Sequence, residues 1–208
     1  MSLLMAASML TVLMSVQPTE EVSAANDYGL ADNIQDGAIL HCFDWKYNDI
    51  KAELQNIAEA GFSAIQTSPA QVGGGSGTWW WLYQPLGFYV GNNDLGTKDE
   101  LKALCAEADT YGIKVVVDVV ANHLAGDHSN IQNDLKDGKY WHNESGGIDY
   151  SNRWQITHRD IGMPDINSEN SYVQQVVKNY LLELKSLGVD GIRWDADRKS
   201  TRLNSSHY

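Results

Sequence analysis

Four short apolar runs alternate along the chain with stretches of helical periodicity, and this alternation limits the possible folds more than any other feature. The runs cover residues 38–45, 63–67, 114–120 and 191–196. Between them, apolar residues recur at the three- and four-residue spacing of a helix buried on one side. Apolar strands separated by such helices are typical of a parallel sheet with right-handed crossovers. The order predicts a doubly wound α/β sheet or part of a (β/α)8 barrel.

Capping residues indicate where the helices begin. Asn48 is suited to cap the helix that follows the first strand. Thr97 and Glu100 have the spacing of a capping box, and so do Ser171 and Gln174. We therefore expect one helix in each of the three connections between the four strands.

Two connections are too long to be plain loops. Residues 70–95 contain a glycine run, Gly73 to Gly77, which lacks the Lys-Ser/Thr of a phosphate-binding loop. Residues 121–167 are long enough for a small inserted domain. Both follow the carboxyl ends of strands, where a barrel places its active site. The chain also lacks a GxGxxG motif after a strand, which weakens the dinucleotide-binding alternative.

Charge and cysteine content narrow the class of protein. The chain has 15 basic and 27 acidic residues, for a formal net charge of −12. Phosphate contacts require Lys and Arg, so we expect no nucleic-acid partner; an acidic surface suits a neutral substrate and a bound cation. Cys42 and Cys105 occupy apolar positions on a strand and a helix. We expect two unpaired thiols.

The first 24 residues have the pattern of a secretory signal peptide. An apolar stretch precedes polar residues and then Val22-Ser23-Ala24, which fits a signal-peptidase site. The stretch is too short for a membrane span, so we expect a secreted protein with no membrane contact after cleavage. No Lys or Arg precedes Lys46, so the usual basic start is missing. The alternatives are a start further upstream and a disordered N-terminus.

Residues 197–208 show no apolar periodicity. From Asp197 to His207 they resemble the conceptual translation of a common sequencing adapter. We expect a non-native tail here, and the alternative is an ordinary disordered C-terminus.

A charged pair stands out on the last strand. Arg193 and Asp195 are two residues apart and therefore point to the same face. Asp118 lies inside the most apolar strand and shares a face with Val116 and Val120. Burial of a carboxylate is costly without a partner, and Arg193 is the candidate. The alternatives are a solvated ion pair at a strand end and a frayed end at Asp118.

Further polar and aromatic residues follow strand ends. Asn122 offers a side-chain oxygen suited to Ca²⁺, and Asp165 offers a carboxylate at the far end of the insertion. His123 could hydrogen-bond a substrate or could be a core histidine. Trp79, Trp80 and their neighbours up to Tyr83 could stack on sugar rings or form a buried patch, and Gln84 could hydrogen-bond hydroxyls.

Four motifs together resemble the α-amylase family, glycoside hydrolase family 13. Asp118-Val119-Val120-Ala121-Asn122-His123 resembles its first signature and Gly191-Ile192-Arg193-Trp194-Asp195-Ala196 its second. Trp80-Trp81-Leu82-Tyr83-Gln84-Pro85 and Gly162-Met163-Pro164-Asp165-Ile166-Asn167 are similar to further family stretches. The resemblance implies the N-terminal half of a secreted bacterial-type enzyme. Its fold would be the first four βα units of a (β/α)8 TIM barrel over residues 25–196, with an inserted domain at about 121–167.

The resemblance also implies a role for each matched residue. Asp195 matches the catalytic nucleophile, Arg193 the arginine that keeps it ionised, and Asp118 a structural aspartate at the barrel mouth. His123 and Tyr83 match groups that bind the sugar, with Tyr83 stacking on it. In addition, Asn122 and Asp165 match Ca²⁺ ligands that join the barrel to its inserted domain, and Thr157 is a looser match.

The family hydrolyses α-1,4-glucan links in starch, glycogen and maltooligosaccharides with retention. Its general acid is a glutamate after the fifth strand, whereas this chain ends at the fourth. We therefore expect the chain alone to be inactive and poorly stable, and the full-length protein to be a monomer. The alternatives are a transglycosylase or α-glucosidase of the same family, and a non-catalytic glucan-binding protein.

Overall fold

The computed structural model describes residues 28–144 and 146–196 of the chain. The expected signal peptide (1–24) and the expected non-native tail (197–208) lie outside the described residues. Among the helices that are described, none combines the length and the apolar character needed to cross a membrane.

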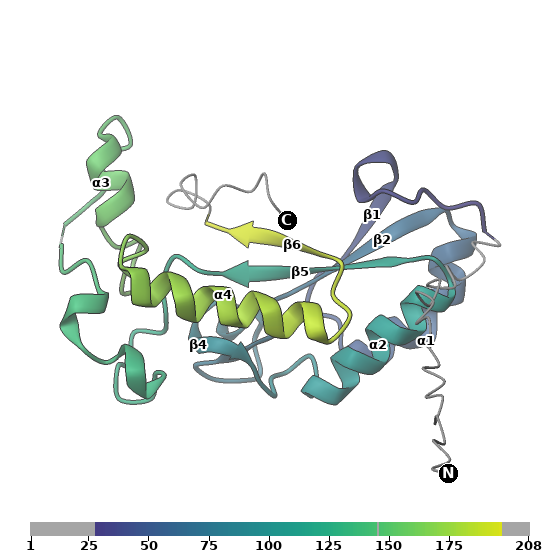
Figure 1. Ribbon diagram of the computed structural model, residues 1–208, viewed down its shortest axis with the longest axis horizontal. Helices are drawn as coiled ribbons and strands as arrows, with labels where there is room; N and C mark the ends of the chain where they lie inside the picture. Colours follow the sequence, from purple (N-terminus) through teal and green to yellow (C-terminus); the bar gives the residue numbers. More distant parts are fainter. Residues whose placement is uncertain (1–27, 145, 197–208) are drawn as a thin grey trace, which may run out of the picture.

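Four parallel strands form the central sheet (Figure 1). They are β1 (Ala38–Cys42), β2 (Phe62–Thr67), β5 (Lys114–Val120) and β6 (Gly191–Asp195), in the spatial order β1-β2-β5-β6. Each strand is added on the same side of the one before it, without the reversal that a doubly wound sheet requires. This sequential order confirms the α/β fold and favours the partial-barrel alternative.

The helices α1 (Tyr47–Glu59), α2 (Lys98–Thr110) and α4 (Ser171–Ser186) lie in the three connections between these strands. α1 contacts β2 and α2, and α2 contacts β5. Val115, Val117 and Val119 alternate along β5 and belong to the hydrophobic core that the helices share. Each buried Val side chain contributes roughly 1.5–3 kcal/mol, so this face provides much of the stability of the sheet.

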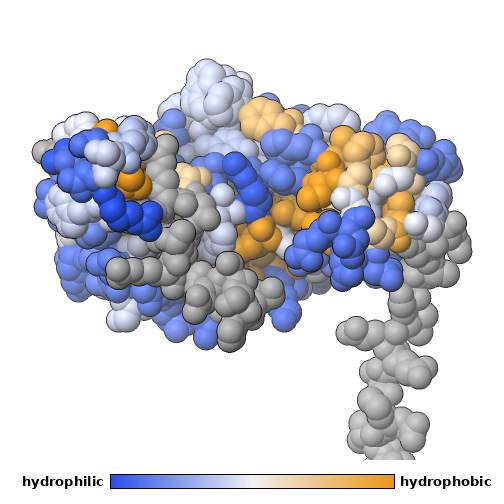
Figure 2. All heavy atoms as spheres, turned by 90° about the horizontal axis from the view of Figure 1, so that it is seen from above, coloured by the Kyte–Doolittle hydropathy of each residue, from blue (hydrophilic) through white to orange (hydrophobic). Residues whose placement is uncertain are grey.

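The opposite face of the sheet carries the polar side chains. The strand register pairs His41 with Gln66, Gln66 with Val116, and Asp118 with Arg193, which places all of them on one face. Ile39 on the same face of β1 is 44% exposed. Apolar residues lie open to solvent along the strands when the molecule is viewed from above (Figure 2). This is the face that lines the interior of a closed barrel.

Residues 70–95 are more ordered than the expected loop. β3 (Gln71–Gly73) pairs antiparallel with β4 (Pro85–Val90), and the 3-10 helix η2 (Trp79–Trp81) lies between them. The buried Gln71 amide bonds to both backbone groups of Val120, at 3.0 Å each. Gln71 therefore fixes this hairpin to the carboxyl end of β5. The glycine run and the short strands give no clear strand periodicity, so the sequence pattern did not predict this hairpin.

The connection from residue 121 to 167 contains only short elements. They are the 3-10 helices η3 (Asn133–Leu135) and η4 (Gly138–Tyr140) and the helix α3 (Arg153–His158). Isolated bridges pair His123 with Asp165 and Trp141 with Ile166. The two ends of the connection therefore lie side by side, as an inserted domain requires; its exact bounds stay a prediction. A further 3-10 helix, η1 (Ile34–Asp36), precedes β1.

The first two capping predictions have different outcomes. The Thr97–Glu100 box is confirmed: the Glu100 amide donates to Thr97 Oγ1 at 3.2 Å, and the Thr97 amide donates to Glu100 Oε2 at 2.7 Å. The Asn48 cap is wrong, because α1 begins one residue earlier, at Tyr47, and its cap position Lys46 makes no side-chain bond. Asn48 instead donates to Glu100 Oε1 at 2.6 Å and links α1 to the start of α2.

The predicted box of Ser171 and Gln174 is also wrong. The N-cap of α4 is Asn170, whose Oδ1 accepts from the Tyr172 amide at 2.9 Å. The Gln174 side chain donates to the Ser168 carbonyl at 2.9 Å. Asn is as favourable as Ser at the N-cap, so Asn170, the residue before Ser171, is the N-cap of α4.

Both cysteines are buried and unpaired in the described structure, as expected. Burial raises the pKa of the Cys42 thiol to about 11 and that of the Cys105 thiol to about 12. Thiols in such surroundings stay protonated at neutral pH and are unreactive.

The cap assignment gives a matched pair of variants. Asn170→Ala removes the bond to the first turn of α4 and should lower the free energy of unfolding by about 1 kcal/mol. Ser171→Ala should leave it unchanged or slightly raised, because Ala favours the first helical position. Urea unfolding followed by circular dichroism measures both, and an equal loss in the two variants would contradict the assignment.

Candidate active site

The buried Asp118 carboxylate lies at the centre of the polar face of the sheet. It is 0% exposed and accepts hydrogen bonds from three elements. Gln66 Nε2 donates to Oδ1 at 2.8 Å, the Tyr83 hydroxyl donates to Oδ2 at 2.8 Å, and Arg193 Nη1 donates to Oδ2 at 3.2 Å. The expected pairing of Asp118 with Arg193 is therefore present. Sequence analysis missed Gln66, although its place at the end of β2 was a signal.

Two opposing effects act on the ionisation of Asp118. Burial raises the pKa of this carboxyl, because it disfavours the charged form. The hydrogen bond from Tyr83 and the positive charge of Arg193 act in the opposite direction without cancelling that effect. The carboxylate therefore depends on its donors, and losing them would leave a buried charge without compensation.

Arg193 joins Asp118 to a second carboxylate. The same Nη1 atom that contacts Asp118 also lies 3.2 Å from Asp195 Oδ1. The Asp195 side chain is 21% exposed, whereas that of Asp118 is 0% exposed. Of the two carboxylates, Asp195 is thus the one that a substrate can reach.

Aromatic side chains surround these carboxylates. Trp79 and Trp80 are 47% and 45% exposed, so these two rings are not part of a buried patch, whereas Leu82 in the same segment is buried. The Tyr83 ring stacks on Phe43, with 6.2 Å between centroids, and Trp79 lies 5.6 Å from Phe43. Burial raises the pKa of Tyr83, so its hydroxyl stays protonated and donates to Asp118. Sequence analysis missed Phe43, which belonged to the apolar run of the first strand.

His123 and Gln84 lie behind this aromatic surface. His123 is 2% exposed, and its Nε2 lies 3.0 Å from the Tyr83 carbonyl oxygen. The ring therefore positions the segment that carries Tyr83. Gln84 is half-buried, and its carbonyl accepts from the Gly74 amide at 2.8 Å. Sugar contacts by the His123 and Gln84 side chains stay predictions.

The end of β5 and the end of the insertion bring two candidate calcium ligands together. The Ile166 amide donates to the Asn122 carbonyl at 3.1 Å, next to the bridge between His123 and Asp165. Asn122 Oδ1 is buried and has no hydrogen-bond donor within the described part of the chain. A buried acceptor in this state is costly, and a hard cation would satisfy it. Asp165 is 1% exposed and supplies a carboxylate beside it. These oxygen donors fit Ca²⁺.

Thr157 fits this set less well. It lies in α3, and its hydroxyl is 3.1 Å from the carbonyl oxygens of Arg153 and Trp154 in the same helix. The hydroxyl is thus already used within α3.

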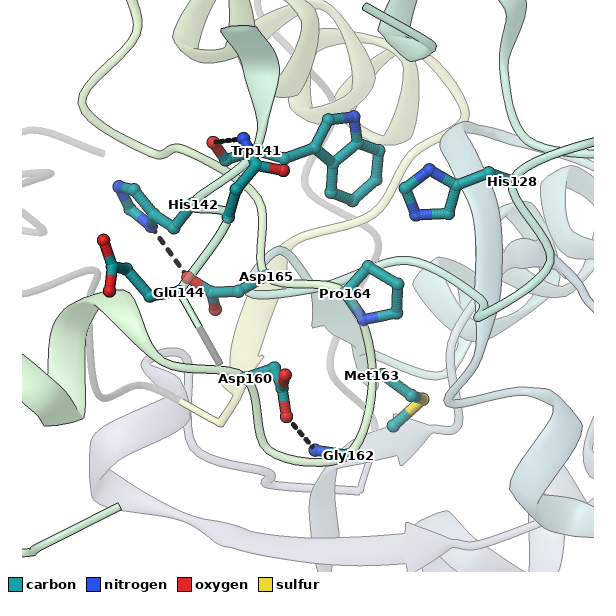
Figure 3. A pocket seen from close by; sticks show the side chains of 10 residues that line it. His128, Trp141, His142, Glu144, Asp160, Gly162, Met163, Pro164 and Asp165 are labelled. Carbon is teal, nitrogen blue, oxygen red and sulfur yellow. Dashed lines mark hydrogen bonds and ion pairs between the residues drawn. The ribbon is translucent and has the colours of Figure 1, made fainter. Parts of the chain in front are cut away.

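A pocket of about 390 Å³ lies in the inserted segment, beside the candidate calcium ligands (Figure 3). Its lining includes the carboxylates of Glu144, Asp160 and Asp165 and the imidazoles of His128 and His142. Asp165 Oδ2 points to His142 Nδ1, 2.7 Å away (Figure 3). This pocket is separate from the strand-end carboxylates Asp118 and Asp195.

Comparison with known proteins agrees with this geometry. Residues 46–205 match the family profile described as "Alpha amylase, catalytic domain". The chain belongs to the α-amylase family of glycoside hydrolases. It is 42% identical to an α-amylase of Clostridium acetobutylicum over 177 residues, which are 80% of this chain and 23% of that protein. It is 36% identical to an α-amylase of Butyrivibrio fibrisolvens over 200 residues, or 88% of this chain and 20% of that one.

Solved structures place the chain in the same family fold. α-Amylase I from Eisenia fetida superposes with a TM-score of 0.71 and 25% identity, over 78% of this chain and 38% of that one. An α-amylase from Geobacillus thermoleovorans superposes with a TM-score of 0.68 and 26% identity, over 80% of this chain and 41% of that one. The TIM-barrel prediction is therefore confirmed, and this chain supplies part of the α-amylase barrel.

The contacts of Asp118 predict a strong effect of its removal. Asp118→Ala removes the buried acceptor of Gln66 and Tyr83, whereas Arg193 keeps Asp195 as a partner. The substitution should lower the free energy of unfolding by about 2–4 kcal/mol. Asp195→Ala, at a partly exposed site, should cost less than about 1 kcal/mol. Urea unfolding of both variants checks this, and a smaller loss for Asp118→Ala than for Asp195→Ala would contradict it.

Proposed function

We propose that this chain is the N-terminal half of the catalytic barrel of an α-amylase. The substrates are α-1,4-glucans such as starch, glycogen and maltooligosaccharides, which the enzyme hydrolyses with retention. One observation carries the proposal: Arg193 holds the accessible carboxylate of Asp195 at the same strand ends as the buried Asp118. The chain spans only 23% and 20% of the two curated relatives, so the activity proposed is that of the longer protein.

Asp195 acts as the nucleophile. Its Oδ attacks the anomeric carbon and forms a glycosyl ester, while a carboxylic acid protonates the departing oxygen; water then cleaves the ester with help from the same acid, now a base. Arg193 Nη1 lies 3.2 Å from Asp195 Oδ1 and orients this carboxylate. Asp118 does not serve as the acid, because it is buried and bonded to three donors. The resemblance to the family assigns the acid to a glutamate after the fifth strand of the complete barrel.

The aromatic surface binds the glucan. Trp79, Trp80 and Tyr83 offer ring faces to the apolar faces of glucose units, and Phe43 supports Tyr83. Two structural relatives support this assignment: the Eisenia fetida enzyme was solved as a mutant with maltohexaose and the Geobacillus thermoleovorans enzyme with acarbose.

Calcium has a structural role. Asn122 and Asp165 would hold the ion, with Thr157 as a weaker candidate, and its charge would join the end of β5 to the end of the insertion. The protein is secreted, monomeric at full length and free of nucleic-acid partners; the acidic net charge of −12 supports the last point.

Activity assays test the catalytic assignment. The 208-residue chain alone should release no reducing sugar from starch, because the proposal assigns the acid to a later part of the longer protein. A full-length protein should release sugars of retained anomeric configuration, seen by proton NMR. Asp195→Asn in that protein should lower kcat/KM by roughly 10⁴-fold or more. Hydrolysis by the 208-residue chain, or an active Asp195→Asn variant, would contradict the assignment, and new glycosidic bonds as main products would favour a transglycosylase.

Calcium binding is tested by thermal unfolding. Ca²⁺ should raise the melting temperature, since a ligand of the folded state stabilises it. Asn122→Ala should abolish most of this increase, whereas Asn56→Ala, on the exposed side of α1, should keep it. An unchanged calcium response in Asn122→Ala would exclude that residue as a ligand.

A further inference from the structure

Two histidines of the inserted segment meet a glutamate that follows its end. His142 follows the bridge residue Trp141, His158 is the last residue of α3, and Glu169 lies just before α4. One ligand atom of each of the three lies within 4.8 Å of the others. The two imidazole rings are 4.6 Å apart between centroids. This group includes none of the calcium ligands proposed above.

The hydrogen bonds of His142 fix its tautomer. Its Nδ1 lies 2.7 Å from Asp165 Oδ2, and the side chains are 8% and 0% exposed (Figure 3). A carboxylate accepts, so Nδ1 carries the proton and the lone pair of the neutral ring is on Nε2. A carboxylate behind a histidine is the usual arrangement of a metal ligand, because it orients the ring and raises its basicity.

His158 is fixed in the same way. Its Nδ1 lies 3.0 Å from the Trp154 carbonyl oxygen and 2.8 Å from the Thr157 hydroxyl. The hydroxyl can donate to the carbonyl oxygens of its own helix and accept from His158, and in that arrangement Nδ1 carries the proton. The Trp154 ring stacks on the imidazole at 4.8 Å and 15°. Stacking and hydrogen bond together hold the ring in one orientation, with its lone pair on Nε2.

We propose that His142, His158 and Glu169 bind a divalent transition-metal ion of the Zn²⁺ class. Two imidazoles and a carboxylate suit such an ion, whereas Ca²⁺ prefers an all-oxygen set. Tetrahedral ligands about 2.0 Å from zinc are about 3.3 Å apart, so the group must contract slightly. Glu169 is exposed, which leaves its side chain room to turn inward. Water completes the coordination.

The ion would cross-link parts of the chain that are otherwise joined only by short contacts. It ties α3 to the segment around His142 and to the start of α4, the helix that precedes β6. The role is structural and does not depend on the proposed hydrolysis. The site would stabilise the inserted segment even in a protein without amylase activity.

Isothermal titration of the metal-free chain with Zn²⁺, in a large excess of Ca²⁺, tests the proposal. The expected result is one Zn²⁺ per chain, with affinity at least tenfold weaker in His158→Gln and in Glu169→Gln. His128→Gln, a histidine of the same insertion outside the group, should bind as the wild type does. Co²⁺ should give the visible spectrum of a four-coordinate ion with nitrogen ligands in the wild type and lose it in His158→Gln.

Circular dichroism of the metal-free variants separates loss of binding from loss of folding, and the exposed Glu169→Gln is the safest variant in this respect. Unchanged zinc affinity in a folded Glu169→Gln would overturn the proposal. So would the absence of any binding in the wild type, or displacement of Zn²⁺ by the excess Ca²⁺. Starch hydrolysis plays no part in these measurements, so failure here leaves the proposed function untouched.

Discussion

The buried carboxylate of Asp118 determines how the rest of the site is arranged. Burial makes its charge costly, and donors from β2, from the aromatic segment and from β6 offset that cost. The side chains of Gln66, Tyr83 and Arg193 are therefore held within hydrogen-bonding distance of this carboxylate. Tyr83 is held with its ring on Phe43, and Arg193 is held between two carboxylates. Arg193, and with it the partly exposed Asp195, is thus positioned by a fully buried carboxylate.

Strand β5, which carries Asp118, also connects the polar site to the inserted segment. Within a few residues of Asp118, the backbone of Val120 bonds to Gln71 in the hairpin, and His123 contacts the carbonyl of Tyr83. Asn122 then pairs with the far end of the insertion. The end of β5 thus contacts the aromatic hairpin, the insertion and strand β6. A structural ion here would stiffen all three at once, because they share one strand end.

The sequence was sufficient to predict the features that depend on periodicity and on strong local chemistry. The parallel strands, the Thr97 box and the pairing of Asp118 with Arg193 all follow from spacing and from the cost of buried charge. The position of Gln66 at a strand end was a signal, but its bond to Asp118 and the contact of Phe43 with Tyr83 depend on which segments become neighbours. Ser171 was mistaken for a cap because Asn170 beside it competes equally well. The hydrogen bonds of the Gln71 side chain to Val120 are likewise known only once the chain is folded.

Arg193 lies on a face of the sheet that is open to water. The Arg193 side chain is 48% exposed, and ion pairs in contact with water contribute little. The face that carries it has no helix over it in the described structure, and Ile39 on the same face is open to solvent. Closing the barrel would remove water from this face, which lowers the local dielectric constant and strengthens the interaction of Arg193 with both carboxylates. Further strands would thus change the electrostatic surroundings of Arg193, Asp118 and Asp195 together.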